Sequence, residues 1–172
     1  AAIDGFTRLT DTARNTARLQ QIDLLWRRLD QTILDHGGLV DKHMGDVIMG
    51  IFGAPSARED DPERAVRCAM MLRELVEEFL AEQFLEQNTV GWRPGAAGMR
   101  AGINTGQVLL GAVGSDLGQT VIGDAVNVAS RLREAAGEPG IYISRDTYRL
   151  IHNLFRVEPL GEISIKGRQM PV

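Results

Sequence analysis

The chain has 172 residues, a formal net charge of −4 and an apolar content of 44%, which suit one domain with a substantial hydrophobic core. The mildly acidic balance argues against a general nucleic-acid or membrane-surface role, because both need a basic face. A single cysteine, Cys68, excludes a disulfide or zinc framework and is interpreted as a small core residue. No apolar run approaches the roughly 18 residues of a membrane span. We therefore expect a cytoplasmic domain without membrane contact.

Both ends of the chain look cut. The sequence begins within an expected strand, residues 1–3, and stops at 170–172 without a closing element. We expect a single domain, residues 1–172, excised from a longer chain.

Apolar residues recur at helical spacing in two long stretches of the first half. The first, residues 16–36, is stopped by a pair of glycines, and the second, residues 62–84, begins with a proline that suits a first helical position. Between them, residues 39–52 predict two short strands that turn at Met44-Gly45.

The second half predicts shorter elements. They are a loop at 86–98, two strands within 99–114 that turn at 104–106, a strand at 119–122, a helix at 123–136 with Asp124 near its N-cap, a strand at 141–144, a helix at 145–152, and edge strands around Phe155 and Ile163. Helices interleaved with mostly hairpin-linked strands indicate an α+β fold with helices packed on a central sheet.

Three glycine-containing turns each follow an expected strand, in IDGFT, MGDVIMGIF and TVIGDAVNVASR. Taken singly, each has a structural interpretation, because glycine supplies a backbone angle and aspartate caps a helix or turn. In the third, Asn127 and Arg131 are four residues apart and share a helix face, which suits an anion that must be oriented and neutralised. The apolar residues around them indicate a rather well buried helix, where unpartnered polar groups would cost free energy.

Five motifs, in order along essentially the whole chain, resemble the catalytic domain of the class III nucleotidyl cyclases. They are IxGFT, KxxGDxxM, RxGINTGxVxxGxVG, TVIGDAVNxASRL and IKG. Each is weak alone, but all five in order are specific. The resemblance implies a ferredoxin-like βαββαβ core with a mostly antiparallel sheet. It also implies attack of a ribose 3′-hydroxyl on the α-phosphorus of a nucleotide, with pyrophosphate as leaving group.

The resemblance also implies the roles of the phosphate-binding residues. Asn127 would orient the ribose, and Arg131 would stabilise the charge that builds on the α-phosphoryl oxygens. The other implied contacts to the phosphates are the backbone N–H groups of Gly5, Phe6 and Thr7 at a helix start, and the side chains of Arg100 and Lys166. Without the resemblance, the last two would pass for ordinary surface cations.

Two further positions imply the choice of base. Lys42 matches the residue that, as lysine, favours adenine by donating to its ring nitrogen. Thr120, seven residues before Asn127, takes the partner position, where its hydroxyl can accept from the adenine amino group. The pair implies ATP as substrate and cyclic AMP as product. Threonine there marks the class IIIb-like subgroup that includes bicarbonate-responsive cyclases, so bicarbonate is a candidate regulator.

The first metal position departs from the family pattern. The family holds two divalent ions, Mg²⁺ or Mn²⁺, with two aspartates. Asp46 matches one of them, with the backbone of Ile3 as a further ligand, but Ala2 falls where the second aspartate belongs. Three explanations stay open: a replacement that impairs turnover, an altered chain end, or a role for Asp4, which follows two residues later on the same strand face.

The resemblance places the metal-binding residues and the residues for adenine, ribose and charge on opposite chains. It therefore implies a homodimer with two equivalent interfacial sites and an inactive monomer. The main hypothesis is an adenylyl cyclase domain, and the alternative is a catalytically silent domain that binds nucleotide or only dimerises. Position 2 separates the two hypotheses. A nucleic-acid-binding module is disfavoured by the acidity and by the lack of an aromatic cluster on a strand.

Overall fold

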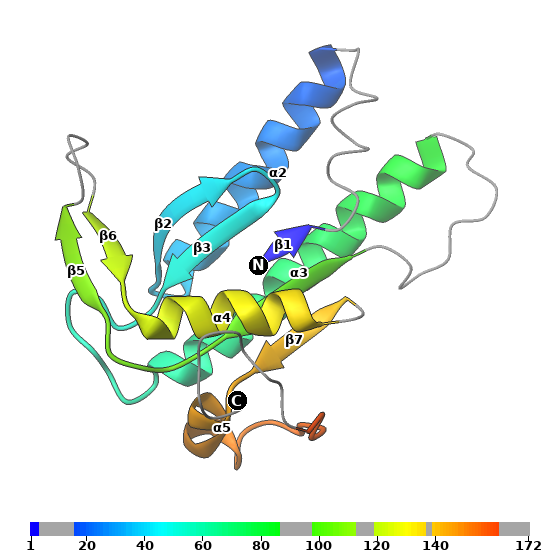
Figure 1. The fold of residues 1–172 in the computed structure, drawn as a ribbon. Coiled ribbons are helices and arrows are strands. Elements are labelled where there is room, and N and C mark those ends of the chain that lie inside the picture. Colours follow the sequence, from blue (N-terminus) through cyan, green and yellow to red (C-terminus); the bar gives the residue numbers. More distant parts are fainter. Residues whose placement is uncertain (4–15, 87–97, 113–118, 137–138, 162–172) are drawn as a thin grey trace.

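The structure is a computed structural model that describes residues 1–3, 16–86, 98–112, 119–136 and 139–161. Its elements in chain order are β1 (Ala2–Ile3), α2 (Thr16–Asp35), β2 (Leu39–Met44), β3 (Val47–Ile51), α3 (Asp61–Glu86), β4 (Met99–Ile103), β5 (Leu109–Ala112), β6 (Gln119–Ile122), α4 (Asp124–Ala135), β7 (Gly140–Ile143) and α5 (Arg145–Ile151). The order from β1 to β4 is the expected βαββαβ core, and the predicted α+β fold class is confirmed (Figure 1).

The main sheet has five strands in the order β2-β3-β1-β4-β7. All neighbouring pairs are antiparallel except β4 and β7, which run parallel. The short strand β1 is therefore central, with β3 on one side and β4 on the other. Strands β5 and β6 form a separate two-stranded antiparallel sheet.

This pairing corrects one prediction. Residues 99–114 do contain two strands, but β4 and β5 are not a hairpin, because they belong to different sheets. The connection at 104–108 carries the chain away from β4 instead of folding it back. Local turn signals such as Asn-Thr-Gly mark where a strand ends, but they do not determine its partner.

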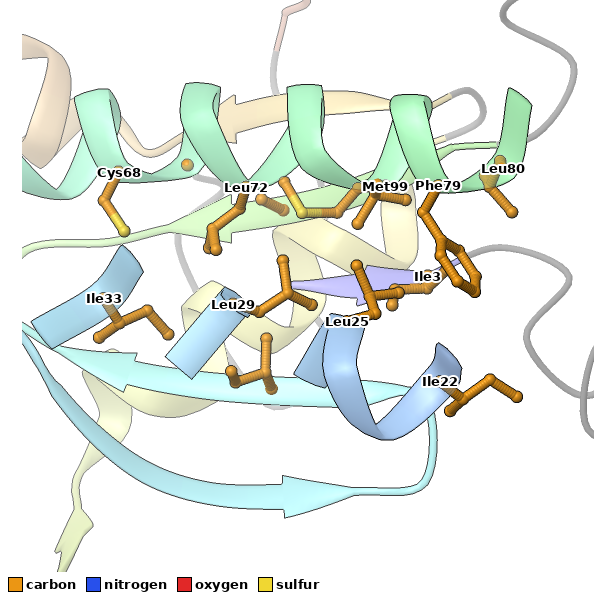
Figure 2. Packing of buried hydrophobic residues seen from close by; sticks show 14 residues of the cluster. Ile3, Ile22, Leu25, Leu29, Ile33, Cys68, Leu72, Phe79, Leu80 and Met99 are labelled. Carbon is orange, nitrogen blue, oxygen red and sulfur yellow. The ribbon is translucent and has the colours of Figure 1, made fainter. Parts of the chain in front are cut away.

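Helices α2 and α3 pack together on one face of the main sheet, and α4 lies over the other (Figure 1). The first face holds the main core, built from the predicted apolar stripes of both helices together with strand residues (Figure 2). Its fully buried members include Leu25, Leu29, Ile33, Val76 and Met99. Because side chains alternate along a strand, Met99 and Ala101 of β4 face this core, and Arg100 and Gly102 face α4.

The α4 face is packed around a glycine. A Cβ atom at Gly102 of β4 would lie 2.0 Å from the carbonyl oxygen of Ala129 and 2.7 Å from the backbone nitrogen of Arg133. Only a residue without a side chain therefore lets α4 approach β4 this closely. The apolar cluster here is small, with Val128 and Leu132 of α4 against Tyr142 of β7.

One further local prediction is wrong. No strand forms around Phe155, where the chain leaves α5 through a turn with Leu154 N donating to Ile151 O at 2.8 Å. Phe155 instead lies beneath the Arg67 guanidinium, whose carbon is 5.4 Å from the ring centroid. The predicted strand at Ile163 and most of the predicted loop at 86–98 lie outside the described residues.

Candidate active site

Lys42 and the strand that carries Thr120 are held together by a single carboxylate. Asp41 Oδ1 accepts a hydrogen bond of 3.3 Å from the backbone N–H of Val121 in β6, and its Oδ2 lies 3.1 Å from Lys42 Nζ. The Asp41 side chain is 0% exposed, whereas that of Lys42 is 39% exposed. The structure thus places β2 with its lysine beside β6, which includes Thr120 opposite Gly111 of β5.

A bulge in β2 makes this arrangement possible. Val40 is paired with Gly50 and Lys42 with Met49, so Asp41 is the extra residue with no partner across β3. A bulge bends its strand and redirects the side chains around it. This is why two sequence neighbours, which an ideal strand would send to opposite faces, form an ion pair here.

Asn127 and Arg131 lie one turn apart on α4, as their spacing predicts. Both are exposed, and Arg131 pairs with Glu134, Nη1 to Oε2 2.7 Å, with half of the arginine side chain accessible. The expectation of a well buried helix is therefore wrong for this face, because α4 buries only Val128 and Leu132 among its helical residues. The physical reason is that each turn of α4 buries at most one side chain against the sheet.

The amino-terminal end of α4 follows a glycine with extended backbone, Gly123, and carries no side-chain cap. Asp124 occupies the first turn, where a negative charge interacts favourably with the helix dipole. The turn is tied to β4 by Asn104, whose Nδ2 donates to Ala125 O at 3.1 Å. This hydrogen bond positions the first turn of α4, which ends at Asn127.

Ala2 and Asp46 meet at the centre of the sheet. Ala2 is opposite Val47 of β3 and Arg100 of β4, and the backbone N–H of Ile3 donates to Asp46 O at 3.1 Å. Asp46 follows Gly45, whose φ of 63° requires glycine in this turn between β2 and β3. The structure therefore brings the two predicted metal positions together, but one of them is a methyl group that is 2% exposed.

The described residues do not fit a site for two divalent cations. Hard cations such as Mg²⁺ need several oxygen ligands, and the carboxylate that the structure describes here is that of Asp46, because Ala2 has no side-chain oxygen. Within the described ranges, no group of three or more His, Cys, Asp or Glu side chains is placed to hold a metal ion. Asp4 lies outside those ranges.

The remaining predicted phosphate contacts are only partly described. Arg100 lies on β4, and its Nη1 donates to Ala136 O at 3.3 Å, at the carboxyl end of α4. The phosphate loop of Gly5, Phe6 and Thr7, and also Lys166, lie outside the described residues. The described residues thus form three groups: Lys42 beside β6, Asn127 with Arg131 on α4, and Ala2 with Asp46 and Arg100 at the sheet centre.

A cavity of about 390 Å³ adjoins these groups. Residues of β2, β3 and β4, of α3 and of α4 line it, and Asn127 is the predicted site residue among them. Lys42, Asp46, Arg100 and Arg131 do not line it. Among the described residues, the lining of this cavity therefore does not bring the predicted polar site residues together.

Two residues with a part in the site were missed by sequence reasoning. Asp41 precedes Lys42, but strict alternation along a strand would place it on the opposite face, and a bulge leaves no clear signal in a single sequence. Asn104 was interpreted only as a turn residue, although its amide reaches α4. The signal for Asn104 was its place directly after a strand, at the start of the Asn104-Thr105-Gly106 turn.

The fold and these groups define an α+β domain with a ferredoxin-like core, whose predicted site residues lie on β2, near the central strand β1 and on α4. The family model for the adenylate and guanylate cyclase catalytic domain matches residues 1–172. The chain therefore belongs to this family, and the predicted resemblance to class III cyclases is confirmed.

Named relatives include both adenylate and guanylate cyclases. An adenylate cyclase of Mycobacterium tuberculosis is 28% identical over 169 residues, which cover 98% of this chain and 36% of that protein. The adenylyl cyclase CyaB of P. aeruginosa is similar in structure, with a TM-score of 0.85, 32% identity and coverage of 99% of this chain and 86% of that one. The guanylate cyclase domain of RhGC from Catenaria anguillulae, solved in complex with GTP, has a TM-score of 0.78, 27% identity and coverage of 99% and 88%.

The chain spans only part of its curated relatives, between 20% and 36% of the length of the first three distinct ones. Among the described helices, none combines the length and apolar character that a membrane-spanning segment requires.

Proposed function

We propose that the chain is the catalytic domain of an adenylyl cyclase, which converts ATP to cyclic AMP and pyrophosphate in a homodimer. The observation that carries the proposal is the placement of Lys42 beside β6, the strand of Thr120, through the hydrogen bond from Val121 N to Asp41 Oδ1. A lysine ammonium donates to the ring nitrogen of adenine, whereas guanine presents an N–H at that position and would leave two donors facing each other.

The residues on α4 suit the chemistry of the phosphate. The O3′–phosphorus bond forms as the bond from the α-phosphorus to the bridging oxygen breaks, and charge builds on the α-phosphoryl oxygens. Arg131 is exposed and can exchange Glu134 for these oxygens, and Asn127 can orient the ribose from one turn away. Because the lining of the described cavity does not bring these groups together, we propose that a second copy completes each site.

A second candidate function is favoured by Ala2. A buried methyl group in place of a ligand carboxylate supports a domain that binds ATP but turns it over slowly or not at all. In this case the domain would regulate the longer protein of which we propose it is a part.

The experiment that separates these candidates measures cyclic AMP formed from ATP and Mn²⁺ by the parent chain and by Ala2→Asp, at several protein concentrations. We expect Ala2→Asp to raise turnover by at least about a hundredfold, with a rate that rises faster than linearly with protein. Ala2→Asn, which has the same shape without the charge, is the matched control and should stay near the parent. If Ala2→Asp is folded, dimeric and ATP-bound but forms no cyclic AMP, the regulatory function replaces the enzymatic one.

The role of Arg131 can be tested in the Ala2→Asp background. Arg131→Ala should lower kcat by about 100- to 1000-fold with a smaller change in KM, because the lost contact forms mainly in the transition state. Arg149→Ala is the matched control, since Arg149 is also exposed and pairs with an acid three residues away, Asp146, at 3.2 Å. Equal losses in both variants would contradict a catalytic role for Arg131.

A further inference from the structure

We infer that Asp41 is a specificity-determining positioning residue of the base site, which sets the place of the Lys42 ammonium and of strand β6 together. The inference rests on the proposed function, because it concerns the recognition of adenine. It adds a residue to which the sequence motifs assign no role.

Both carboxylate oxygens of Asp41 are engaged, and in different elements. Oδ1 accepts from the backbone of β6, and Oδ2 holds the ammonium of Lys42 on β2. The carboxylate is fully buried, and burying a charge costs free energy unless it is paired and hydrogen-bonded. A buried carboxylate on a strand whose neighbouring residues are partly or fully exposed is therefore a costly feature, which a positioning role would explain.

The bulge at Asp41 also supports a positioning role. Without it, Asp41 and Lys42 would point to opposite faces of β2, and the carboxylate could not reach both the ammonium and β6. Bulges are frequent beside active sites, where they redirect a side chain. Here the redirected side chain belongs to the residue before the lysine that we propose reads the base.

The consequence for recognition follows from the chemistry of lysine. Its ammonium lies on a flexible four-carbon stem and carries three donors. The contact to Asp41 restricts the position of Nζ, so that the ammonium is held where we propose that it meets the ring nitrogen of a purine. Because the same carboxylate accepts from Val121 of β6, one residue holds both the lysine and the strand that includes Thr120.

Asp41 does not contact the base, since its side chain is fully buried. Its effect should therefore pass through Lys42. Loss of the carboxylate should weaken the binding of ATP and leave that of GTP unchanged, because only adenine offers the acceptor that the positioned ammonium meets.

The test measures the Kd of ATP and of GTP by displacement of a ribose-labelled fluorescent ATP analogue from the full chain, which requires no turnover. Asp41→Asn keeps an oxygen for Val121 N–H and a similar volume but removes the charge that holds Lys42. We expect ATP affinity to fall about tenfold, a loss typical of one charged hydrogen bond, while GTP affinity stays the same. Asp30→Asn is the matched control, because Asp30 Oδ1 pairs with His43 Nε2 at 2.8 Å beside Lys42, and it should change neither Kd.

A double variant tests the route of the effect. In a Lys42→Met background, Asp41→Asn should cause no further loss of ATP affinity, because the ammonium is gone and the asparagine still accepts from Val121 N–H. Equal losses for ATP and GTP, an unchanged preference for ATP, or additive losses in the double variant would each overturn the inference. If Asp41→Asn does not fold, Asp41→Glu, which keeps the charge on a longer arm, should lower ATP affinity selectively, and an unchanged preference would overturn the inference.

The outcomes separate this inference from the proposed function. A parent chain that prefers ATP while Asp41→Asn behaves like the parent overturns the inference and leaves the proposed function standing. A parent chain that binds ATP no more tightly than GTP overturns the adenine preference itself and the inference with it.

Discussion

The two faces of the main sheet are packed in opposite ways. The face under α2 and α3 is filled with large aliphatic and sulfur-containing side chains that form one continuous cluster. The face under α4 is packed by close backbone approach at Gly102, with only a small apolar cluster. The residues proposed to act on the base, ribose and phosphate include Lys42 on β2 and Asn127 and Arg131 on α4, and none of these three belongs to the large core.

The difference suggests that one face of the sheet mainly stabilises the fold, whereas the other carries residues for the proposed reaction. Large side chains in a dense core contribute most of the hydrophobic free energy of folding. A thinly covered face leaves polar side chains accessible to a ligand or to a second copy of the chain. The first face should therefore be sensitive to loss of volume, and the second to gain of volume.

The largest expected effect is a loss of volume under α2. Leu29→Ala should lower the free energy of unfolding by about 2–5 kcal/mol, because Leu29 is 1% exposed at the centre of the main cluster. Urea denaturation measures the change. Leu24→Ala on the same helix, where the leucine is 58% exposed, should change stability by less than about 0.5 kcal/mol. Similar losses of stability in both variants would contradict the burial of Leu29 in the main core.

A gain of volume under α4 should come next. Gly102→Ala should cost about 1–3 kcal/mol and also weaken nucleotide binding, because α4 must move to accommodate the new methyl group. Thermal unfolding and the binding assay measure the two effects. Gly111→Ala is the control, since a Cβ atom there meets nothing within 4 Å. A Gly102→Ala variant as stable as the Gly111→Ala variant would contradict the close approach of α4.

The smallest expected effect is a dependence of stability on pH through Cys68 in the main core. Burial raises the pKa of the Cys68 thiol from 9.0 to about 12. The native thiol stays neutral while the unfolded thiol ionises, so this residue leaves stability unchanged below about pH 8 and lowers it as the pH rises further. Between pH 7 and 9.5 its contribution should fall by roughly 1 kcal/mol. Denaturation at both pH values measures the loss, and Cys68→Ala should show a smaller pH dependence than the parent.

Elements with a long repeating pattern could be predicted from the sequence. The stripes of α2 and α3 identified more than half of the main core cluster, including Leu25, Leu29 and Val76, because helical periodicity repeats over 20 or more residues. The short strands were predicted less well. The pairing of β5 with β6 and the absence of a strand at Phe155 depend on contacts that local composition does not encode.

The candidate site divides in the same way. The spacing of Asn127 and Arg131 determined that they share a face of α4, but their exposure depends on how narrowly α4 packs on β4 and β7. The identity of Ala2 can be read directly from the chain. The burial of Ala2 beside Val47 and Arg100 depends on the order of strands in the sheet, and it could not be predicted from the sequence. It leaves Asp46 as the carboxylate that the structure describes there.

The sequence by itself thus determined the family, the helices and the types of residue available for chemistry, because motifs and periodicities are local properties of a chain. Only the tertiary structure decided which strands are neighbours, that β2 carries a bulge, and that a buried carboxylate at Asp41 joins Lys42 to β6. The last of these features joins residues that are 80 positions apart in the sequence. The free energies of these features depend on packing and desolvation, which no local pattern specifies.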